Sequence, residues 1–156
     1  MNERTRILII DDDESIRKAL SAVLEEQGYS VDTAQSGSEG IEKSKTNFYN
    51  LSLIDIRLPD MEGTDLLKGL KSTVPPMVKI IVTGYPSLAN AIEALNKGAD
   101  AYILKPLAMD TVLKVIREHL KKQQEARKYS EDKVAEFIEA RARELEAETN
   151  IAQRTR

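Results

Sequence analysis

The feature of this sequence that most limits its fold is a regular alternation of two patterns along the chain. Short aliphatic or β-branched runs lie at residues 6–10, 30–34, 50–55, 77–84 and 100–106. Segments with apolar residues at helical spacing follow them, at 14–28, 38–44, 63–72, 87–98 and from about Ala108. Strands that alternate with helices form βαβ units, whose right-handed crossovers place helices on both faces of a parallel sheet. We therefore predict an α/β fold with a five-stranded, doubly wound parallel sheet.

The residues within and around these runs support the assignment. The runs ILII, KIIV and YIL are almost continuously apolar, as is typical of strands that are buried on both faces of a sheet. Gly28 and Gly98 are expected to end the first and fourth helices. Ser36 or Ser38 is expected to cap the second helix, and Thr64 the third.

Length and composition exclude several classes of protein. The 156 residues suffice for one domain and an appendage, and the net charge of −3 gives no general attraction to nucleic acid or membrane surfaces. The chain has no cysteine, which excludes disulfides and thiol chemistry and suits a cytoplasmic protein. No apolar run approaches the roughly 20 residues that a membrane-spanning helix needs.

Polar side chains follow several of the predicted strands, at the point where each strand ends. The first run ends in Asp11, Asp12 and Asp13, the third in Asp55, the fourth in Thr83 and the fifth in Lys105. Open parallel sheets bind ligands at the carboxyl ends of their strands, so these side chains are expected to gather at one edge. Clustered carboxylates repel one another unless a cation intervenes, and oxygen ligands favour Mg²⁺, Ca²⁺ or Mn²⁺. A cation and Lys105 could together neutralise a phosphoryl group on Asp55, which would then act as a nucleophile.

Four motifs give the chain a resemblance to a known family. They are ILIIDDD, LIDIRLPDMEG, IIVTGY and AYILKP, each at a strand end. In this order and spacing they resemble the receiver domains of two-component response regulators, over residues 5 to about 120. The resemblance implies a flavodoxin-like strand order of 2-1-3-4-5 and a receiver domain at residues 1–120.

The resemblance also implies a role for each residue at the acidic end of the sheet. Asp11 and Asp12 would recruit Mg²⁺, together with Asp55 and the backbone carbonyl of Arg57. Asp55 would be the phosphoacceptor, and Lys105 would pair first with it and then with its phosphate.

Three further residues complete the implied set. Thr83 would hydrogen-bond a phosphoryl oxygen, and Tyr102 would be the switch aromatic that changes rotamer as Thr83 moves. Pro106 corresponds to a proline that commonly follows a cis peptide bond in this family.

The resemblance implies a phospho-accepting signalling switch rather than an enzyme acting on other substrates. A sensor histidine kinase would phosphorylate Asp55, and a downstream protein would read the result. The resemblance also implies that Arg57 and Tyr85 would border the approach of water to the phosphoryl group. Neither side chain offers a carboxylate or amide that would orient a water, so we expect slow spontaneous dephosphorylation.

Two alternative functions remain open from the sequence. One is a phosphatase with an aspartyl nucleophile, although Arg57 stands where such enzymes carry their general acid. The other is the receiver fragment of a larger DNA-binding regulator. Beyond residue 120 we find no helix-turn-helix pattern and no basic patch, so no contact with nucleic acid is expected of this chain.

Residues 121–156 form a separate segment rich in helix-forming residues, and we expect the last helix to continue through it. Nine Lys or Arg and eight Asp or Glu nearly balance there. A broken apolar stripe includes Val134, Phe137, Ile138 and Leu145. The segment is therefore either a solvated linker or a helix that pairs with a partner or with a second copy of the chain.

Overall fold

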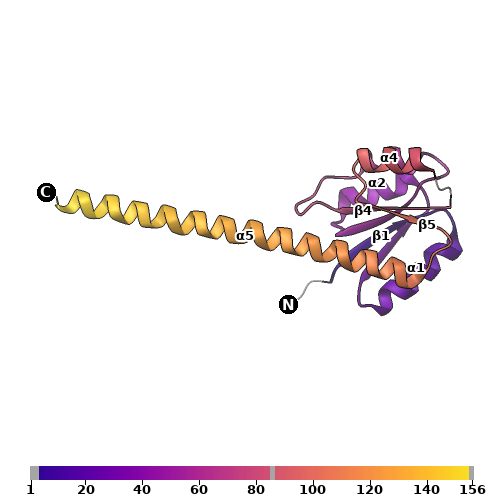
Figure 1. The fold of residues 1–156 in the computed structure, drawn as a ribbon, viewed down its shortest axis with the longest axis horizontal. Coiled ribbons are helices and arrows are strands. Elements are labelled where there is room, and N and C mark those ends of the chain that lie inside the picture. Colours follow the sequence, from indigo (N-terminus) through magenta and orange to yellow (C-terminus); the bar gives the residue numbers. More distant parts are fainter. Residues whose placement is uncertain (1–3, 85–86, 155–156) are drawn as a thin grey trace. The chain divides into compact units, whose positions relative to one another are not determined.

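The structure, a computed structural model, describes residues 4–84 and 87–154. Five strands and five helices alternate along this part of the chain (Figure 1). In chain order they are β1 (Arg6–Ile10), α1 (Glu14–Glu26), β2 (Ser30–Ala34), α2 (Gly37–Thr46), β3 (Leu51–Asp55), α3 (Gly63–Gly69), β4 (Val78–Thr83), α4 (Leu88–Asn96), β5 (Ala101–Leu104) and α5 (Met109–Arg154).

The strands form one parallel sheet with the order β2-β1-β3-β4-β5. Both the predicted fold class and the strand order implied by the resemblance are therefore confirmed. The central strand β3 is buried along its whole length, which explains its nearly unbroken apolar sequence.

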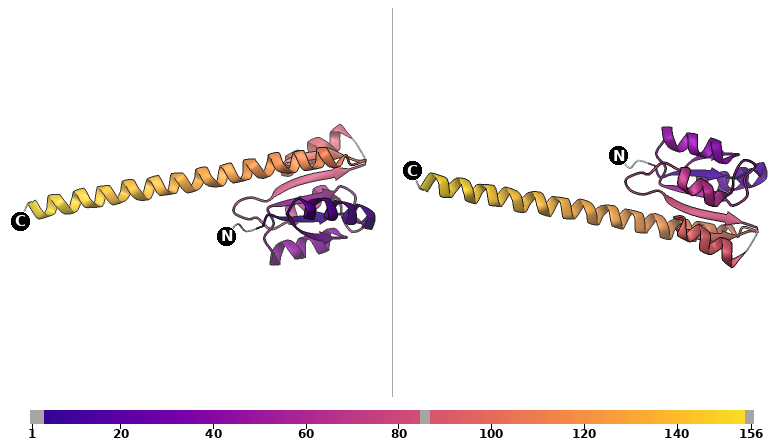
Figure 2. Two further views of the ribbon diagram at one scale, coloured as in Figure 1. Left: turned by 90° about the horizontal axis from the view of Figure 1, so that it is seen from below. Right: turned by 90° about the horizontal axis from the view of Figure 1, so that it is seen from above.

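Helices lie on both faces of the sheet (Figure 2). Two layers of apolar side chains, one on each face, hold them there. On one face, Leu20 and Leu24 of α1 and Val112 and Ile116 of α5 pack on the odd-numbered side chains of β1 and β3. On the other face, α2, α3 and α4 pack on the even-numbered side chains of these strands through Ile41, Leu66, Leu67 and Ala94. Because the helices cover both faces, the chemistry of the sheet is confined to its edges and strand ends.

The helix caps agree with the sequence analysis except at α3. Asp13 caps α1 by accepting hydrogen bonds from the backbone N–H groups of Ser15 and Ile16. Ser36 caps α2. The prediction that Thr64 caps α3 is wrong, because the helix begins at Gly63 and Thr64 is buried within its first turn.

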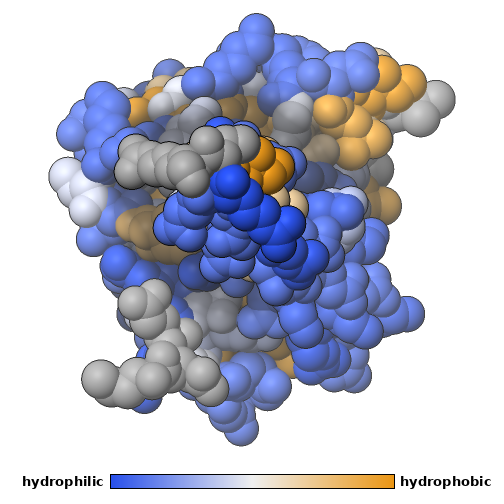
Figure 3. Space-filling view, turned by 90° about the vertical axis from the view of Figure 1, so that its left-hand side faces the viewer, coloured by the Kyte–Doolittle hydropathy of each residue, from blue (hydrophilic) through white to orange (hydrophobic). Residues whose placement is uncertain are grey.

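The last helix runs from Met109 to Arg154, as the composition of the C-terminal segment predicts. Contacts within the chain divide it into two compact units, one ending at Leu120 and the other beginning at Lys121. Among the described helices, none combines the length and the apolar character that crossing a membrane would require. Hydrophilic side chains cover most of the face shown in Figure 3, with hydrophobic ones exposed in small patches between them.

Candidate functional site

The sheet brings the predicted site residues to one edge. Ile10 of β1 lies opposite Ile54 of β3, so the residues that follow them, Asp11 and Asp55, lie at the same level. Thr83 ends β4 opposite Leu104, the last residue of β5, and Lys105 follows directly. These residues come from four separate strands, and only the parallel arrangement places them together.

Three carboxylates form the centre of this edge. Asp11, Asp12 and Asp55 each offer a carboxylate oxygen, and these oxygens lie within 4.8 Å of one another. Asp11 and Asp55 are buried, whereas Asp12 is exposed. A cluster of hard oxygen donors with one open side fits a divalent cation such as Mg²⁺, which binds few protein ligands and keeps several waters. The three aspartates are thus the residues of this site that could hold a metal ion.

Lys105 supplies positive charge to the buried carboxylates. Its ammonium nitrogen lies 3.0 Å from Oδ2 of Asp11 and 3.6 Å from Oδ2 of Asp55. The peptide bond between Lys105 and Pro106 is cis, as the resemblance implies. Asp11 is fixed further by a hydrogen bond that its Oδ1 accepts from the backbone N–H of Asp13, at 2.9 Å.

The charge on Asp55 is only partly compensated. Burial and the neighbouring charge of Asp11 raise the pKa of the Asp55 carboxyl, while Lys105 and a hydrogen bond from the backbone N–H of Arg57 oppose this rise. The net pKa shift is upward, so the site disfavours the ionised form of Asp55. An additional bound cation would offset this unfavourable negative charge. Conversion of the Asp55 carboxylate into an acyl phosphate whose charge is neutralised by neighbouring cations would also relieve it.

Arg57 is the second residue of the loop after β3. Its backbone N–H donates to the Asp55 carboxylate, its side chain is exposed, and it forms an isolated antiparallel bridge with Glu62. Its carbonyl as a metal ligand stays a prediction. Tyr85, the other residue predicted to slow dephosphorylation, lies outside the described residues.

Thr83 and Tyr102 are neighbours on the same face of the sheet. Thr83 is fully buried at the end of β4, and Tyr102 is partly buried on β5. Burial raises the pKa of the Tyr102 phenol, and a side-chain hydrogen bond with Thr83 acts in the opposite direction. The two residues predicted to act as a switch therefore interact directly.

Two features of the site were not predicted from the sequence. A Cβ added at Gly63 would lie 2.4 Å from the backbone oxygen of Asp55, so α3 begins almost in contact with the end of β3. Asp60, at the tip of the same loop, accepts three hydrogen bonds from Gly37 and Ser38 at the start of α2. The aspartate was visible in the sequence, but its partners lie more than twenty residues away and leave no local signal.

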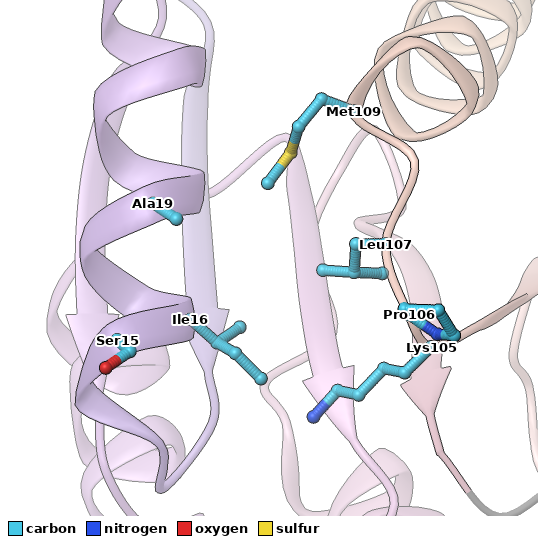
Figure 4. A pocket seen from close by; sticks show the side chains of 7 residues that line it. All are labelled: Ser15, Ile16, Ala19, Lys105, Pro106, Leu107 and Met109. Atoms are coloured by element: carbon cyan, nitrogen blue, oxygen red, sulfur yellow. The ribbon is translucent and has the colours of Figure 1, made fainter.

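A largely apolar pocket of about 290 Å³ borders the site on its α1 side (Figure 4). Ser15, Ile16 and Ala19 of α1 line one wall of it. The segment from Lys105 to Leu107, together with Met109, lines the opposite wall. Lys105 thus belongs both to this pocket and to the acidic cluster.

Comparison with known proteins gives a match over most of the chain. The family model described as the response regulator receiver domain matches residues 7–117. Among curated proteins, the transcriptional regulatory protein ZraR of Klebsiella oxytoca is 38% identical over 118 residues, which is 76% of this chain and 27% of ZraR. The chain spans between 26% and 55% of the length of the curated relatives it matches.

Solved structures resemble the chain in the same region. A CheY-like receiver domain protein from Methanospirillum hungatei is 47% identical with a TM-score of 0.76, covering 80% of this chain and 99% of that one. A Burkholderia pseudomallei response regulator containing a phosphorylated aspartic acid and a calcium ion is 26% identical with a TM-score of 0.66, covering 78% of this chain and 72% of that one. These matches give no support to the phosphatase alternative.

Proposed function

The chain belongs to the response regulator receiver domain family, and we propose that it is a switch in which Asp55 accepts a phosphoryl group from a sensor histidine kinase. The receiver domain is a signalling module, and any catalysis by it is limited to its own phosphorylation and dephosphorylation. We place this reaction in the cytoplasm, in keeping with a chain that has no cysteine.

One observation carries this proposal. The oxygens of Asp11, Asp12 and Asp55 converge within 4.8 Å, and the Lys105 ammonium lies 3.0 Å from Asp11 and 3.6 Å from Asp55. A nucleophilic carboxylate beside one fixed cation and two further carboxylates is suited to phosphoryl transfer, which depends on positioning and charge neutralisation. The solved structure from Burkholderia pseudomallei contains a phosphorylated aspartic acid, which agrees with this chemistry.

In the proposed reaction an Asp55 carboxylate oxygen forms a bond to phosphorus, and the bond from phosphorus to the donor's imidazole nitrogen breaks. The nitrogen keeps the electron pair of that bond. Lys105, already within ion-pair distance of Asp55, would then pair with a phosphoryl oxygen. The Thr83 hydroxyl would donate to another oxygen, because Thr83 ends the strand next to Asp55.

A divalent cation completes the proposed site. Mg²⁺, held by Asp11, Asp12, Asp55 and the Arg57 carbonyl, would supply positive charge to the phosphoryl oxygens and offset the repulsion among the carboxylates. The chain's own contribution is the fixed arrangement of the oxygen donors, since Asp11 is held by both Lys105 and the Asp13 backbone.

Phosphorylation would be communicated to partners through Thr83 and Tyr102. These side chains are hydrogen-bonded to each other before phosphorylation. If the Thr83 hydroxyl turns to the phosphoryl group, Tyr102 loses this hydrogen bond and is free to take another rotamer at the surface near α4 and α5. A downstream effector would distinguish the two arrangements.

We also propose that the C-terminal part of α5 pairs with a second copy of the chain. Val134, Phe137, Ile138 and Leu145 are exposed although they are large and apolar. Phe137 and Ile138 follow Val134 by three and four residues, and Leu145 follows Ile138 by seven, so the four side chains lie on one face of the helix. Because the nine basic and eight acidic residues of 121–156 nearly cancel, two copies can approach without strong repulsion.

Replacing the phosphoacceptor tests the proposal directly. With acetyl phosphate and Mg²⁺, the parent protein should gain one acid-stable, base-labile phosphoryl group, and Asp55→Ala should gain none. Asp13→Asn is the matched control, because Asp13 directly follows Asp11 and Asp12 but is not part of their cluster with Asp55, and it caps α1, a role that asparagine also fills. Stoichiometric labelling of Asp55→Ala, measured by intact-protein mass, would show that another residue is the acceptor.

A further inference from the structure

We propose that Asp60 is a positioning residue for the phosphoacceptor, which fastens the tip of the loop between β3 and α3 to α2 and so holds the Arg57 backbone against Asp55. This inference rests on the proposed function of Asp55. Asp60 itself touches none of the reacting groups. Asp60 acts on the Arg57 backbone through the loop between them, and three sets of contacts connect the two residues.

The first set fastens the tip of the loop to α2. Oδ1 of Asp60 accepts from the backbone N–H of Gly37 at 2.9 Å. Oδ2 accepts from the backbone N–H of Ser38 at 2.9 Å and from its hydroxyl at 2.6 Å. The first N–H groups of a helix have no partner within the helix and favour a negative charge. Two of these N–H groups and one hydroxyl of α2 donate to the exposed Asp60 carboxylate, and they hold the tip of the loop to the helix.

The cap of α2 is divided between two residues. Ser36, at the N-cap position, accepts from the backbone N–H of Glu39. Asp60 receives the two preceding N–H groups, those of Gly37 and Ser38. Because the Ser36 side chain accepts from Glu39, the Asp60 carboxylate of the loop completes the cap at Gly37 and Ser38, and α2 in turn anchors the loop.

The second set packs the loop closely on α2. A Cβ added at Gly37 would lie 2.5 Å from Cγ and Sδ of Met61, the residue after Asp60. Met61 also packs on the apolar layer that lies beneath α2 and α3. The polar bonds of Asp60 and the apolar contact of Met61 thus hold the same tip from two sides.

The third set connects the tip to its base at the site. The backbone N–H of Leu58 donates to the Met61 carbonyl at 3.2 Å, and Arg57 bridges Glu62. At the base, the N–H of Gly63 donates to the Ile56 carbonyl at 2.6 Å. This ladder makes the loop a short, cross-bonded unit rather than a free segment. Its two ends are the Asp60 carboxylate and the Arg57 N–H that donates to Asp55.

Asp60→Asn tests the inference, since it keeps the size of the side chain and replaces one acceptor oxygen by a donor. The measurements are the Mg²⁺ dissociation constant and the hydrogen exchange of the Arg57 amide, both by NMR, with the rate of labelling by acetyl phosphate. We expect Mg²⁺ binding to weaken by about tenfold, the usual order for the loss of a group that orients a metal site, with faster exchange at Arg57. Ser38→Ala, which removes only the hydroxyl bond, should give a smaller change in the same direction.

Glu42→Gln is the matched control, because it removes one negative charge from α2 at an exposed residue that forms an ion pair with Lys45. It should leave both NMR measurements within about twofold of the parent. Asp60→Asn and Ser38→Ala variants that both match the parent would overturn the positioning role. If Asp60→Asn fails to fold, the Mg²⁺ affinity and Arg57 exchange of Ser38→Ala alone test the positioning role, and values equal to those of the parent would overturn it. A parent that is not labelled at Asp55 would instead overturn the proposed function, and the Mg²⁺ and exchange measurements would still decide the role of Asp60.

Discussion

At the scale of single residues, the site is governed by an imbalance of charge around Asp55. Asp11 and Asp55 are buried, and Lys105 is the cation that lies within ion-pair distance of both among the described residues. Two buried carboxylates sharing one ammonium leave a net negative charge in a poorly hydrated place, which is unfavourable. The receiver domain therefore keeps at its centre a group that a cation or a phosphoryl complex would stabilise.

This imbalance predicts that Asp55→Asn stabilises the protein in metal-free buffer at pH 7. Because burial and Asp11 raise the pKa of Asp55 in the folded state, folding favours its neutral form. The associated stability is present below the unfolded pKa of about 3.9 and is lost as pH rises through the folded pKa. Asparagine stays neutral throughout, so its advantage should appear near pH 7 and vanish below about pH 4.

Thermal unfolding at several pH values measures this effect, and a gain of about 1 kcal/mol corresponds to roughly 4 °C. Lys105 keeps its partner Asp11 in the variant, so no buried cation is left alone. With saturating Mg²⁺ the parent should become more stable than Asp55→Asn, because a ligand at ten times its dissociation constant stabilises the protein that binds it by about 1.4 kcal/mol. Asp13→Asn should resemble the parent in both buffers. A metal-free Asp55→Asn variant that is less stable than the parent at pH 7 would contradict this account.

At the scale of secondary-structure elements, the close approach of α3 to β3 sets the geometry of the acceptor. A Cβ at Gly63 would lie 2.4 Å from the Asp55 backbone oxygen and 2.9 Å from the Ile56 Cα. Backbone atoms in a buried strand cannot move aside as a flexible side chain can. The start of α3 and the end of β3 are therefore fixed to each other at Asp55, the proposed phosphoacceptor.

We predict that Gly63→Ala destabilises the fold by about 1–3 kcal/mol, the usual range for overpacking of a buried site, and slows labelling of Asp55. Gly84→Ala is the matched control, because its added Cβ would meet the Lys105 side chain only at 3.8 Å or more. Urea denaturation and the acetyl phosphate assay measure the two effects. If the two alanine variants had equal free energies of unfolding, α3 would have to move away from β3 without loss of stability, which would contradict the prediction.

The elements also show why sequence patterns predicted some features and missed others. The strands followed from apolar runs, because burial on both faces of a sheet leaves a visible pattern in the sequence. Their order followed from the resemblance to receiver domains, and the observed sheet confirms it. The predicted Thr64 cap was wrong because α3 begins at Gly63, with Glu62 at the N-cap position two residues before Thr64, and Thr64 is buried within the first turn. The contact of Asp60 with Ser38 joins residues 22 apart, and no local rule of capping reaches so far.

At the scale of the whole molecule, the C-terminal unit differs physically from the rest of the chain. From Lys121 onward, the described residues are exposed apart from Gln123. The ion pairs among these described residues join side chains three or four positions apart. Such pairs contribute only a few tenths of a kcal/mol each, and an isolated helix is marginal in water. Burial of the apolar face formed by Val134, Phe137, Ile138 and Leu145 would supply the missing stability.

We therefore predict that the parent chain is a dimer and that Phe137→Glu makes it a monomer. Phe137 is 72% exposed, and losing about 1.5–3 kcal/mol of burial for each of two copies weakens association by a factor on the order of 100 or more. Ala147→Glu adds the same charge at an exposed residue that the helical repeat places roughly 140° around the helix from Val134, and it should remain dimeric. Sedimentation equilibrium of the full chains measures the association, and circular dichroism should show less helix in Phe137→Glu alone. A parent that sediments as a monomer at concentrations of tens of micromolar, with its full helix content, would instead mean that the segment is a solvated linker helix.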